Sequence, residues 1–207
     1  KTRTLVELIS QETRQNHKVL ATAESNAAVD NILERLMENK KLNLTRLGHP
    51  QRVSDHNITQ TLAYKVEKHE LNSRIKKIHK KIDKLIEKRN SFTRPTPQLR
   101  RGYGNYDILH NASKGKGGRG VSPEKMKSMA QWIECNQEID ELHDDIKRVE
   151  NKMIRDIIEI SDVILATNSS AALDSIAKTK FDVAIIDEAS QATIPSILIP
   201  IAKARRF

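Results

Sequence analysis

Residues 181–191 are Phe-Asp-Val-Ala-Ile-Ile-Asp-Glu-Ala-Ser-Gln, in which a continuous apolar run leads directly into two adjacent carboxylates. A strand that is apolar along its whole length, as from Val183 to Ile186, is covered on both faces, as in a parallel sheet with helices on each side. Such sheets bind ligands at the carboxyl ends of their strands. The stretch therefore predicts an α/β fold with Asp187 and Glu188 at the ligand-binding edge.

The acidic pair has the layout of a Walker B magnesium site. In such a site Asp187 would hold Mg²⁺, and Glu188 would orient and deprotonate the water that attacks the γ-phosphate of ATP. Strands also end in Asp or Glu simply because the chain leaves the core for solvent. The rest of the sequence has to decide between these interpretations.

Length and composition limit the class of protein. The 207 residues can hold one α/β domain with an elongated insertion, and the formal net charge of +9 favours a polyanionic partner such as nucleic acid. The one cysteine, Cys135, cannot form an internal disulfide. No stretch approaches the roughly 20 apolar residues that span a bilayer. We therefore expect a soluble protein without a membrane partner, in a reducing compartment that is cytoplasmic or, in a eukaryote, nuclear.

Apolar periodicity predicts the elements around the acidic pair. Helices are expected over residues 4–13 and from Ser25 or Asn26 onward, and strands over 18–22, 42–47 and 162–167. Residues 1–60 and 157–207 would then form one incomplete α/β domain, interrupted by an insertion at 61–156.

The insertion has a different rhythm. Apolar residues recur at heptad spacing from Leu71 to Leu85 and again from Trp132 to Met153, which predicts two long helices in an antiparallel hairpin. Basic residues are in excess over 61–91 and acidic residues over 124–160, so the arms are expected to attract each other. The lysines of the first arm fit a merely solvated helix face as well.

The connection between the arms, at about residues 92–123, is rich in glycine and basic residues, and its one acid is Asp107. This composition predicts a loop with one short helix near residues 106–111. Its cations, with Tyr103 and Tyr106, suit phosphate contacts and base stacking, but solvated disorder fits the same composition. The residues expected to touch phosphates are Arg100, Arg101, Lys114, Lys116 and Arg119.

Lys1-Thr2 before an amphipathic helix looks like the end of a Walker A loop, Gly-x-x-x-x-Gly-Lys-Thr. In that interpretation Lys1 would reach the β- and γ-phosphates, and the Thr2 hydroxyl would complete the magnesium shell. An arbitrary fragment start explains two residues equally well. Because the chain opens on lysine, we expect both of its ends to lie inside a longer protein.

Four further motifs follow in order: Ala23-Glu-Ser-Asn-Ala-Ala-Val-Asp30, Arg46-Leu-Gly-His-Pro50, Leu165-Ala-Thr-Asn-Ser169 and Asp187-Glu-Ala-Ser-Gln191. With Lys1-Thr2, this order resembles the first RecA-like domain of superfamily 1 helicases of the Upf/immunoglobulin-mu-binding (Smubp) type. The resemblance covers nearly all of residues 1–60 and 157–207. It implies a RecA-like, P-loop NTPase sheet with a helical insertion where the hairpin lies.

The resemblance implies a motor that couples ATP hydrolysis, with Mg²⁺, to 5′→3′ movement along single-stranded DNA or RNA. In the family's pattern Lys1 and Thr2 bind nucleotide and metal, Asp187 binds the metal, Glu188 is the catalytic base and Gln191 couples nucleotide state to a neighbouring domain. The nucleic-acid positions are Ser25, Asn26, Arg46, His49, Pro50, Thr167 and Asn168. A second RecA-like domain of the same polypeptide is also implied, so this fragment by itself should hydrolyse little ATP.

The sequence departs from the family pattern at one position, and two other classes of protein fit part of it. Glu24 occupies a position where many relatives have proline. A non-enzymatic coiled-coil scaffold with a nucleic-acid-binding tip is the first alternative. A clamp ATPase of the structural-maintenance type is the second, but its Leu-Ser-Gly-Gly signature is missing from residues 157–182. Ser25 with Asn26 also suits a plain helix cap, and residues 167–169 suit a strand-ending turn.

Overall fold

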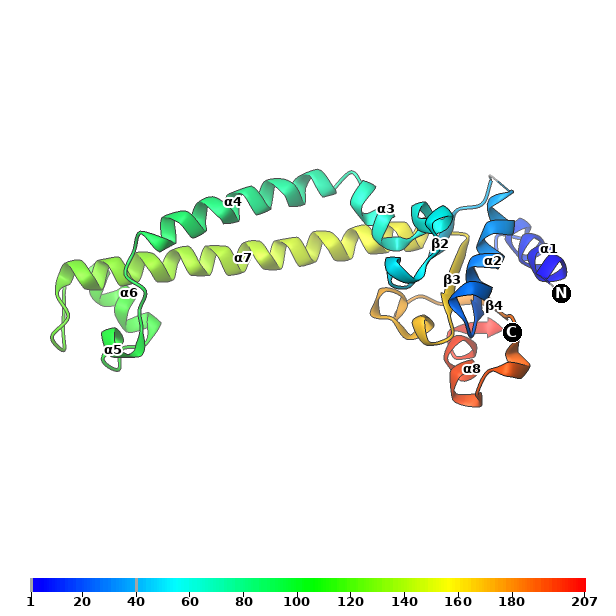
Figure 1. Cartoon of the computed structure of the whole chain (residues 1–207). Helices are drawn as coiled ribbons and strands as arrows, with labels where there is room; N and C mark the ends of the chain where they lie inside the picture. Colours follow the sequence, from blue (N-terminus) through cyan, green and yellow to red (C-terminus); the bar gives the residue numbers. More distant parts are fainter. Residues whose placement is uncertain (1, 40) are drawn as a thin grey trace. The chain divides into compact units, whose positions relative to one another are not determined.

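The computed structural model describes residues 2–39 and 41–207 (Figure 1). The chain folds into two compact units. Residues 1–70 and 150–207 form the first, which we term the α/β unit, and residues 71–149 form the second, the hairpin unit.

A five-stranded parallel sheet forms the centre of the α/β unit, in the order β2-β3-β1-β4-β5. The strands are β1 (Val19–Ala23), β2 (Leu44–Arg46), β3 (Val163–Thr167), β4 (Phe181–Ile186) and β5 (Ala204–Arg206). Every residue of β1, β2 and β3 is buried, as expected for strands covered on both faces. The predicted α/β class with a parallel sheet is confirmed.

Helices cover both faces of the sheet. They are α1 (Thr2–Arg14), α2 (Asn26–Met37), α3 (Leu62–Lys68), α7 (Pro123–Ile160) in its last turns, and α8 (Ile194–Ile201). On one face Ile9 of α1 and Ile32 of α2 pack against β1, β3 and β4 in one core cluster. On the other face Ile158 of α7 packs with Leu20 and Phe181 in a second cluster. Alternating side chains of β1 and β3 therefore fill two separate cores.

Five short 3₁₀ helices complete the α/β unit: η1 (Pro50–Arg52), η2 (Asp55–Gln60), η3 (Ser169–Ala172), η4 (Asp174–Ile176) and η5 (Ala189–Gln191). Three of them, η1, η3 and η5, begin at a residue of the motif that ends or follows a strand. The chain therefore turns sharply at the motifs that lie at the carboxyl ends of β2, β3 and β4.

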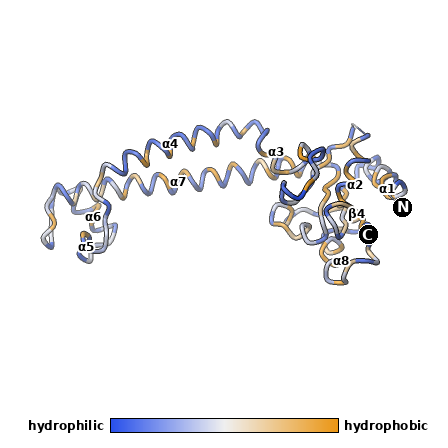
Figure 2. The backbone as a smooth tube through the Cα atoms, viewed as in Figure 1, coloured by the Kyte–Doolittle hydropathy of each residue, from blue (hydrophilic) through white to orange (hydrophobic). Residues whose placement is uncertain are grey.

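The hairpin unit contains two antiparallel helices, α4 (Asn72–Asn90) and the greater part of α7 (Figure 1). Lys81 pairs with Glu138 (2.7 Å), and the Arg89 guanidinium donates to Oδ1 of Asn136 (2.9 Å), so residue numbers fall along one helix as they rise along the other. Most of α4 is hydrophilic, with Ile75, Ile82 and Leu85 as its buried residues (Figure 2). The attraction expected between a basic and an acidic arm is visible in the Lys81–Glu138 pair.

The tip of the hairpin unit contains the short helix expected near residues 106–111, but it has more structure than the expected loop. It contains α5 (Pro97–Arg100) and α6 (Asn105–Ser113). Ile108 of α6 and Val121 are buried against Met126, Met129 and other residues at the start of α7. Disorder is thus the wrong interpretation, because a few apolar side chains within the glycine-rich segment form their own small core.

The C-terminal region differs as well, since neither α8 nor β5 was predicted. Within the part of the chain that the structure describes, no helix combines the length and apolarity that crossing a membrane requires.

Candidate functional site at the carboxyl edge of the sheet

The sequence motifs meet at one edge of the sheet. Parallel pairing places Ala23 at the end of β1 opposite Thr167 at the end of β3, and Thr22 opposite Ile186 at the end of β4. Arg46 ends the neighbouring strand β2, opposite Leu165. This is the edge at which open parallel sheets bind their ligands.

The acids Asp187 and Glu188 form a tight turn directly after β4. The Asp187 N–H donates to the carbonyl of Thr22 (2.8 Å), and the Glu188 N–H donates to Oδ1 of Asp187 (2.9 Å). Glu188 has a left-handed backbone (φ 52°, ψ 34°), and its carbonyl accepts from the N–H of Gln191 (2.8 Å). The turn therefore fixes the backbone of the acids and leaves Glu188 and Gln191 exposed.

The strand that precedes Asp187 packs against α1. Val183 and Ile185 belong to the core cluster that contains Ile9 of α1. Asp187 directly follows this strand, two residues after Ile185, and its N–H continues the pairing of β4 with β1. Thr2 is half-buried at the start of α1. The strand that leads to Asp187 therefore packs against the helix that begins at Thr2.

The donor set around Asp187 fits magnesium chemistry. No three His, Cys, Asp or Glu side chains gather as a metal cluster among residues 2–39 and 41–207. Mg²⁺, however, typically takes one or two carboxylates and fills its shell with water and phosphate oxygens. In the described chain only the Glu188 N–H contacts the Asp187 carboxylate, which leaves an oxygen for a cation. Lys1, the predicted phosphate ligand, lies outside the described residues.

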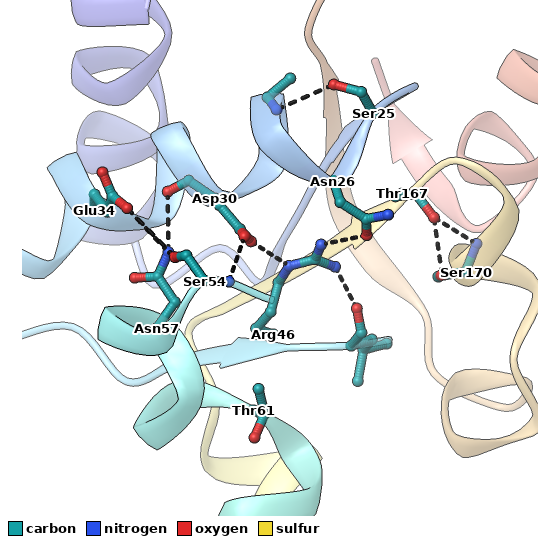
Figure 3. Close-up of polar contacts among 12 residues, drawn as sticks. Ser25, Asn26, Asp30, Glu34, Arg46, Ser54, Asn57, Thr61, Thr167 and Ser170 are labelled. Atoms are coloured by element: carbon teal, nitrogen blue, oxygen red, sulfur yellow. Dashed lines mark hydrogen bonds and ion pairs between the residues drawn. The ribbon is translucent and has the colours of Figure 1, made fainter. Parts of the chain in front are cut away.

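Arg46 is completely buried at the end of β2 (Figure 3). Its Nε donates to Oδ1 of Asp30 (3.0 Å), its Nη2 to Oδ1 of Asn26 (2.9 Å), and its Nη1 to the carbonyl of Leu47. Burial lowers the pKa of Arg46, and the hydrogen bond and charge of Asp30 oppose this shift. The structure thus places Arg46 beneath the motif, where it joins β2 to α2, with no surface of its own for a phosphate.

Asp30 extends this network to the loop after β2 (Figure 3). Its Oδ2 accepts from the Ser54 N–H (3.0 Å), and the Ser54 hydroxyl accepts from Nδ2 of Asn57 (2.8 Å). Asp30 and Asn57 are both buried. The sequence motifs predict no role for these residues. One sequence feature could have indicated that Asp30 is buried. It directly follows Val29, which belongs to the apolar stripe of α2.

Ser25 and Asn26 lie where α2 begins. The Ser25 hydroxyl accepts from the Ala28 N–H (3.1 Å), so this exposed residue caps the helix. Asn26 is half-buried and gives its Oδ1 to Arg46, which leaves the amide NH₂ group of Asn26 free of that contact. Capping and ligand contact are compatible here, because an exposed helix N-terminus presents N–H donors to anions.

His49 and Pro50 follow β2 on the same edge. His49 is exposed, and its Nδ1 accepts from the Gln51 N–H (3.4 Å), while Pro50 is half-buried as the first residue of η1. Gly48 before them has φ 134°, and a Cβ there would lie 3.4 Å from Nη1 of Arg46. Glycine is therefore required at position 48, and the turn it allows directs His49 to the surface.

Thr167 and Asn168 are buried at the end of β3, with exposed fractions of 6% and 0%. The Thr167 hydroxyl donates to Oγ of Ser170 (2.8 Å) and accepts from the Ser170 N–H (3.2 Å). Asn168 donates from Nδ2 to Glu24 (3.0 Å). These two predicted residues shape the turn, and the exposed member of the motif is Ser169.

Glu24, the departure from the family pattern, links three segments. Its Oε2 accepts from Asn168 and also from the Ser196 hydroxyl of α8 (2.7 Å). The carboxylate therefore ties the ends of β1 and β3 to the helix that follows the acidic turn and Gln191. A proline at this position has no side-chain acceptor with which to make either bond.

The remaining predicted residues belong to the tip of the hairpin unit. Arg100 is half-buried, and its guanidinium donates to the Pro95 carbonyl (2.8 Å) and to Oδ1 of Asn105 (2.6 Å). The others, Arg101, Lys114, Lys116 and Arg119, are exposed.

Comparisons with known proteins identify related chains. A sequence model described as an AAA domain matches residues 1–207. All of the chain is 44% identical to an uncharacterized ATP-dependent helicase of Methanocaldococcus jannaschii, of which it covers 32%. Over 99% of its length it is 32% identical to the DNA-binding protein SMUBP-2 of Rattus norvegicus, covering 18% of that protein.

A third relative is the DNA polymerase alpha-associated DNA helicase A of Schizosaccharomyces pombe, at 30% identity over 97% of the chain and 25% of the relative. The chain thus spans about a third or less of each of these relatives. The match to SMUBP-2 agrees with the Smubp-type resemblance that the motifs indicated.

Proposed function

The chain belongs to the AAA domain family, and from this premise we propose that it is part of an ATP-dependent helicase or translocase acting on single-stranded DNA or RNA. One observation carries the proposal. Asp187 and Glu188 follow a buried parallel strand, β4, whose Val183 and Ile185 share a core cluster with Ile9 of the helix that begins at Thr2. The names of the relatives, which include an ATP-dependent helicase and a DNA helicase, support the same class.

The nucleotide side of the proposed site uses the acidic turn and the start of α1. Asp187 and Thr2 would hold Mg²⁺, which neutralises phosphate charge when bound, and Lys1 would contact the same phosphates. Glu188 would orient and deprotonate the attacking water. Gln191, held to Glu188 through the backbone, would transmit the nucleotide state to a second RecA-like domain of the same polypeptide.

The nucleic-acid side uses the neighbouring strand ends. The exposed or half-buried residues Ser25, Asn26, His49 and Pro50 would contact the strand. The buried residues Arg46, Thr167 and Asn168 would instead hold those contacts in position. Movement in the 5′→3′ direction is proposed from the family resemblance.

The proposed organisation is a RecA-like domain of residues 1–60 and 157–207, interrupted by the hairpin insertion at 61–156. We place the protein in a reducing compartment, cytoplasmic or nuclear, because its one cysteine, Cys135, is a free and buried thiol. The 207-residue chain by itself should turn over little ATP, since the second RecA-like domain would complete the site.

The test is Glu188→Gln in the intact protein. Loss of the general base should lower nucleic-acid-stimulated ATP hydrolysis by about 10²- to 10⁴-fold. ATP binding, measured with a fluorescent ATP analogue, should stay near the parental affinity because amide and carboxylate have the same shape. Asp174→Asn is the matched control, because Asp174 is an exposed acid in η4, ahead of the amino end of β4, and it should keep parental turnover.

Unimpaired turnover in Glu188→Gln would remove Glu188 as the base. A non-enzymatic scaffold predicts a different pattern. In that case the intact parental protein would bind nucleic acid equally with and without ATP and would hydrolyse none.

A further inference from the structure

Two arginines clasp each other at the tip of the hairpin unit. Nη1 of Arg101 donates to the Arg119 carbonyl (2.9 Å), and Nη1 of Arg119 donates to the Arg101 carbonyl (3.0 Å). Both residues have left-handed backbones, with φ 46° and 49°. A Cβ on the following Gly120 would lie 2.4 Å from Nη1 of Arg101. The geometry of this clasp thus requires glycine and holds two guanidinium groups at an exposed surface.

The clasp is not neutralised from within the tip. Asp107 is the single acid of residues 91–123, and its Oδ2 accepts from the Gly104 N–H (2.9 Å) as the cap of α6. Lys114 and Lys116 add two exposed ammonium groups just after α6. Each arginine of the clasp uses one N–H on a neutral carbonyl, so the positive charge remains available to an external anion.

An exposed aromatic stack lies on the outer face of α6. Tyr106 is 77% exposed, and its ring stacks on that of His110 with centroids 5.8 Å apart and an interplanar angle of 12°. The opposite face of α6 carries Ile108, which is fully buried in the tip core. Tyr103 is different, because its ring lies 4.5 Å beneath the Arg119 guanidinium and is half-buried. Tyr106 is therefore the ring that a ligand can reach.

We propose that the outer face of α6 and the Arg101–Arg119 clasp form a binding surface for single-stranded nucleic acid. An unpaired base stacks on the Tyr106 ring, and the adjoining phosphates contact the clasp and Lys114 with Lys116. Aromatic platforms beside cations are the usual means of sequence-tolerant binding to single strands. An acidic polypeptide would satisfy the charges but would leave the exposed part of the Tyr106 ring in water.

This surface deepens the proposed function, because it assigns a second contact with the same nucleic-acid track. The proposed contact at the tip depends on the protein binding nucleic acid and does not depend on ATP hydrolysis. The acidic turn and the tip can therefore fail independently, and Glu188→Gln should leave binding at the tip unchanged.

Tyr106→Ala in the full chain tests the stacking contact. The probe is a fluorescein-labelled oligothymidylate of about 12 nucleotides, with affinity measured by anisotropy without nucleotide. Loss of one stacked base should weaken binding by about 5- to 100-fold. Tyr106→Phe keeps the ring and should retain parental affinity. Phe207→Ala removes an aromatic ring that is 79% exposed in the α/β unit, and it should also retain parental affinity.

Lys114→Gln with Lys116→Gln tests the phosphate contacts, because neither side chain belongs to the clasp. Two lost contacts should lower the slope of log affinity against log salt by about 1.4, at about 0.7 for each contact on single strands. The matched control, Lys76→Gln with Lys77→Gln, removes the same charge from the exposed face of α4 and should leave the slope nearly unchanged.

Three results would overturn the proposal. The first is parental affinity in Tyr106→Ala with an intact fold, verified by the fluorescence of Trp132 beside the tip core. The second is equal slope changes in the two lysine pairs. The third is displacement of the probe by polyglutamate as readily as by unlabelled oligothymidylate, which would indicate an acidic protein partner instead.

Discussion

Arginine has opposite roles in the two units of this chain. Arg46 of the α/β unit is 0% exposed and gives N–H donors to a carboxylate, a side-chain amide and a carbonyl. Arg101 and Arg119 of the hairpin unit are exposed and give donors to each other's carbonyls. The charge of Arg46 is paired within the protein, whereas the guanidinium groups of Arg101 and Arg119 are oriented at the surface and can contact a ligand.

The difference follows from the cost of desolvation. A guanidinium removed from water needs an opposite charge and several acceptors, which Asp30, Asn26 and Leu47 supply to Arg46. An exposed guanidinium needs only to be oriented, because water solvates what the protein does not. Basic residues in this sequence therefore divide by burial into those that build a site and those that can contact a ligand.

The largest loss of stability is expected from Arg46→Ala, which removes the buried arginine of the two classes. Removing one partner of a buried ion pair leaves Asp30 uncompensated, and the free energy of unfolding should fall by about 3–5 kcal/mol. Urea denaturation followed by circular dichroism measures this. Because Trp132 is the one tryptophan and lies in the hairpin unit, its fluorescence transition should move less than the circular dichroism transition.

Arg205→Ala is the matched control for Arg46→Ala. Arg205 pairs with Asp182 at 3.5 Å, but its side chain is 78% exposed. An exposed pair contributes about 0–1 kcal/mol, so this variant should unfold close to the parental midpoint. Equal losses in the two variants would show that burial does not separate these arginines.

A smaller effect is expected from Arg119→Ala, which opens the clasp. One hydrogen bond to the Arg101 carbonyl and the contact with the Tyr103 ring would be lost, at about 1–2 kcal/mol together. Trp132 fluorescence should report the change, since this residue packs against the tip core. Lys116→Ala should change stability by no more than about 0.5 kcal/mol. A loss as large as that of Arg46→Ala would mean that the clasp is a structural core and not an oriented surface.

The smallest loss of stability is expected at Arg206, whose side chain is 55% exposed and pairs with Glu12, a carboxylate that is 14% exposed. Its Nη2 lies 2.9 Å from Oε2 of Glu12, which also accepts from Nδ1 of His17 at 2.7 Å. The hydrogen bond with His17, and then that with Arg206, hold the pKa of Glu12 below its ordinary 4.5, and burial opposes them. A carboxyl with a lowered folded pKa adds stability above its unfolded pKa, and this stability is lost as the pH falls through the folded value.

We therefore expect Arg206→Ala to destabilise the chain by less than about 1 kcal/mol at neutral pH and by less still below pH 4. Urea unfolding of the parental chain, Arg206→Ala and Glu12→Gln at both pH values measures this dependence. Parental and Glu12→Gln chains that lose the same stability on acidification would contradict it.

Local sequence was sufficient for the central strands and the acidic turn. β1, β3 and β4 each contain a short, mostly apolar run, as buried parallel strands do, and Asp187 and Glu188 adjoin one of them. β5 was missed because Ala204–Arg206 has no strand pattern of its own and becomes a strand only by pairing with β4. At the tip the composition predicts the short helix seen as α6 but not α5 or the core, because glycine and charge dominate a segment in which few apolar residues are sufficient for a core.

The Arg46 network was beyond local sequence for another reason. Asp30 and Arg46 lie on different elements, and a basic residue in a motif is as consistent with a ligand contact as with a buried pair. Arg46 is removed from solvent by tertiary packing, in which α2 supplies Asp30 and Asn26 and the segment at Thr61 pairs with its backbone. Thr167 and Asn168 were assigned to ligand contact for the same reason, and their burial became visible only once Ser170 and Glu24 were placed.

The left-handed backbone of Glu188 has a consequence for any attempt to make this protein more robust. A side chain with a Cβ in that conformation costs of order 1 kcal/mol, and glycine or asparagine adopts it more easily. Selection for thermal tolerance by itself would favour losing the carboxylate at this position. Keeping glutamate there means that the molecule retains a small built-in instability at the residue on which turnover is proposed to depend.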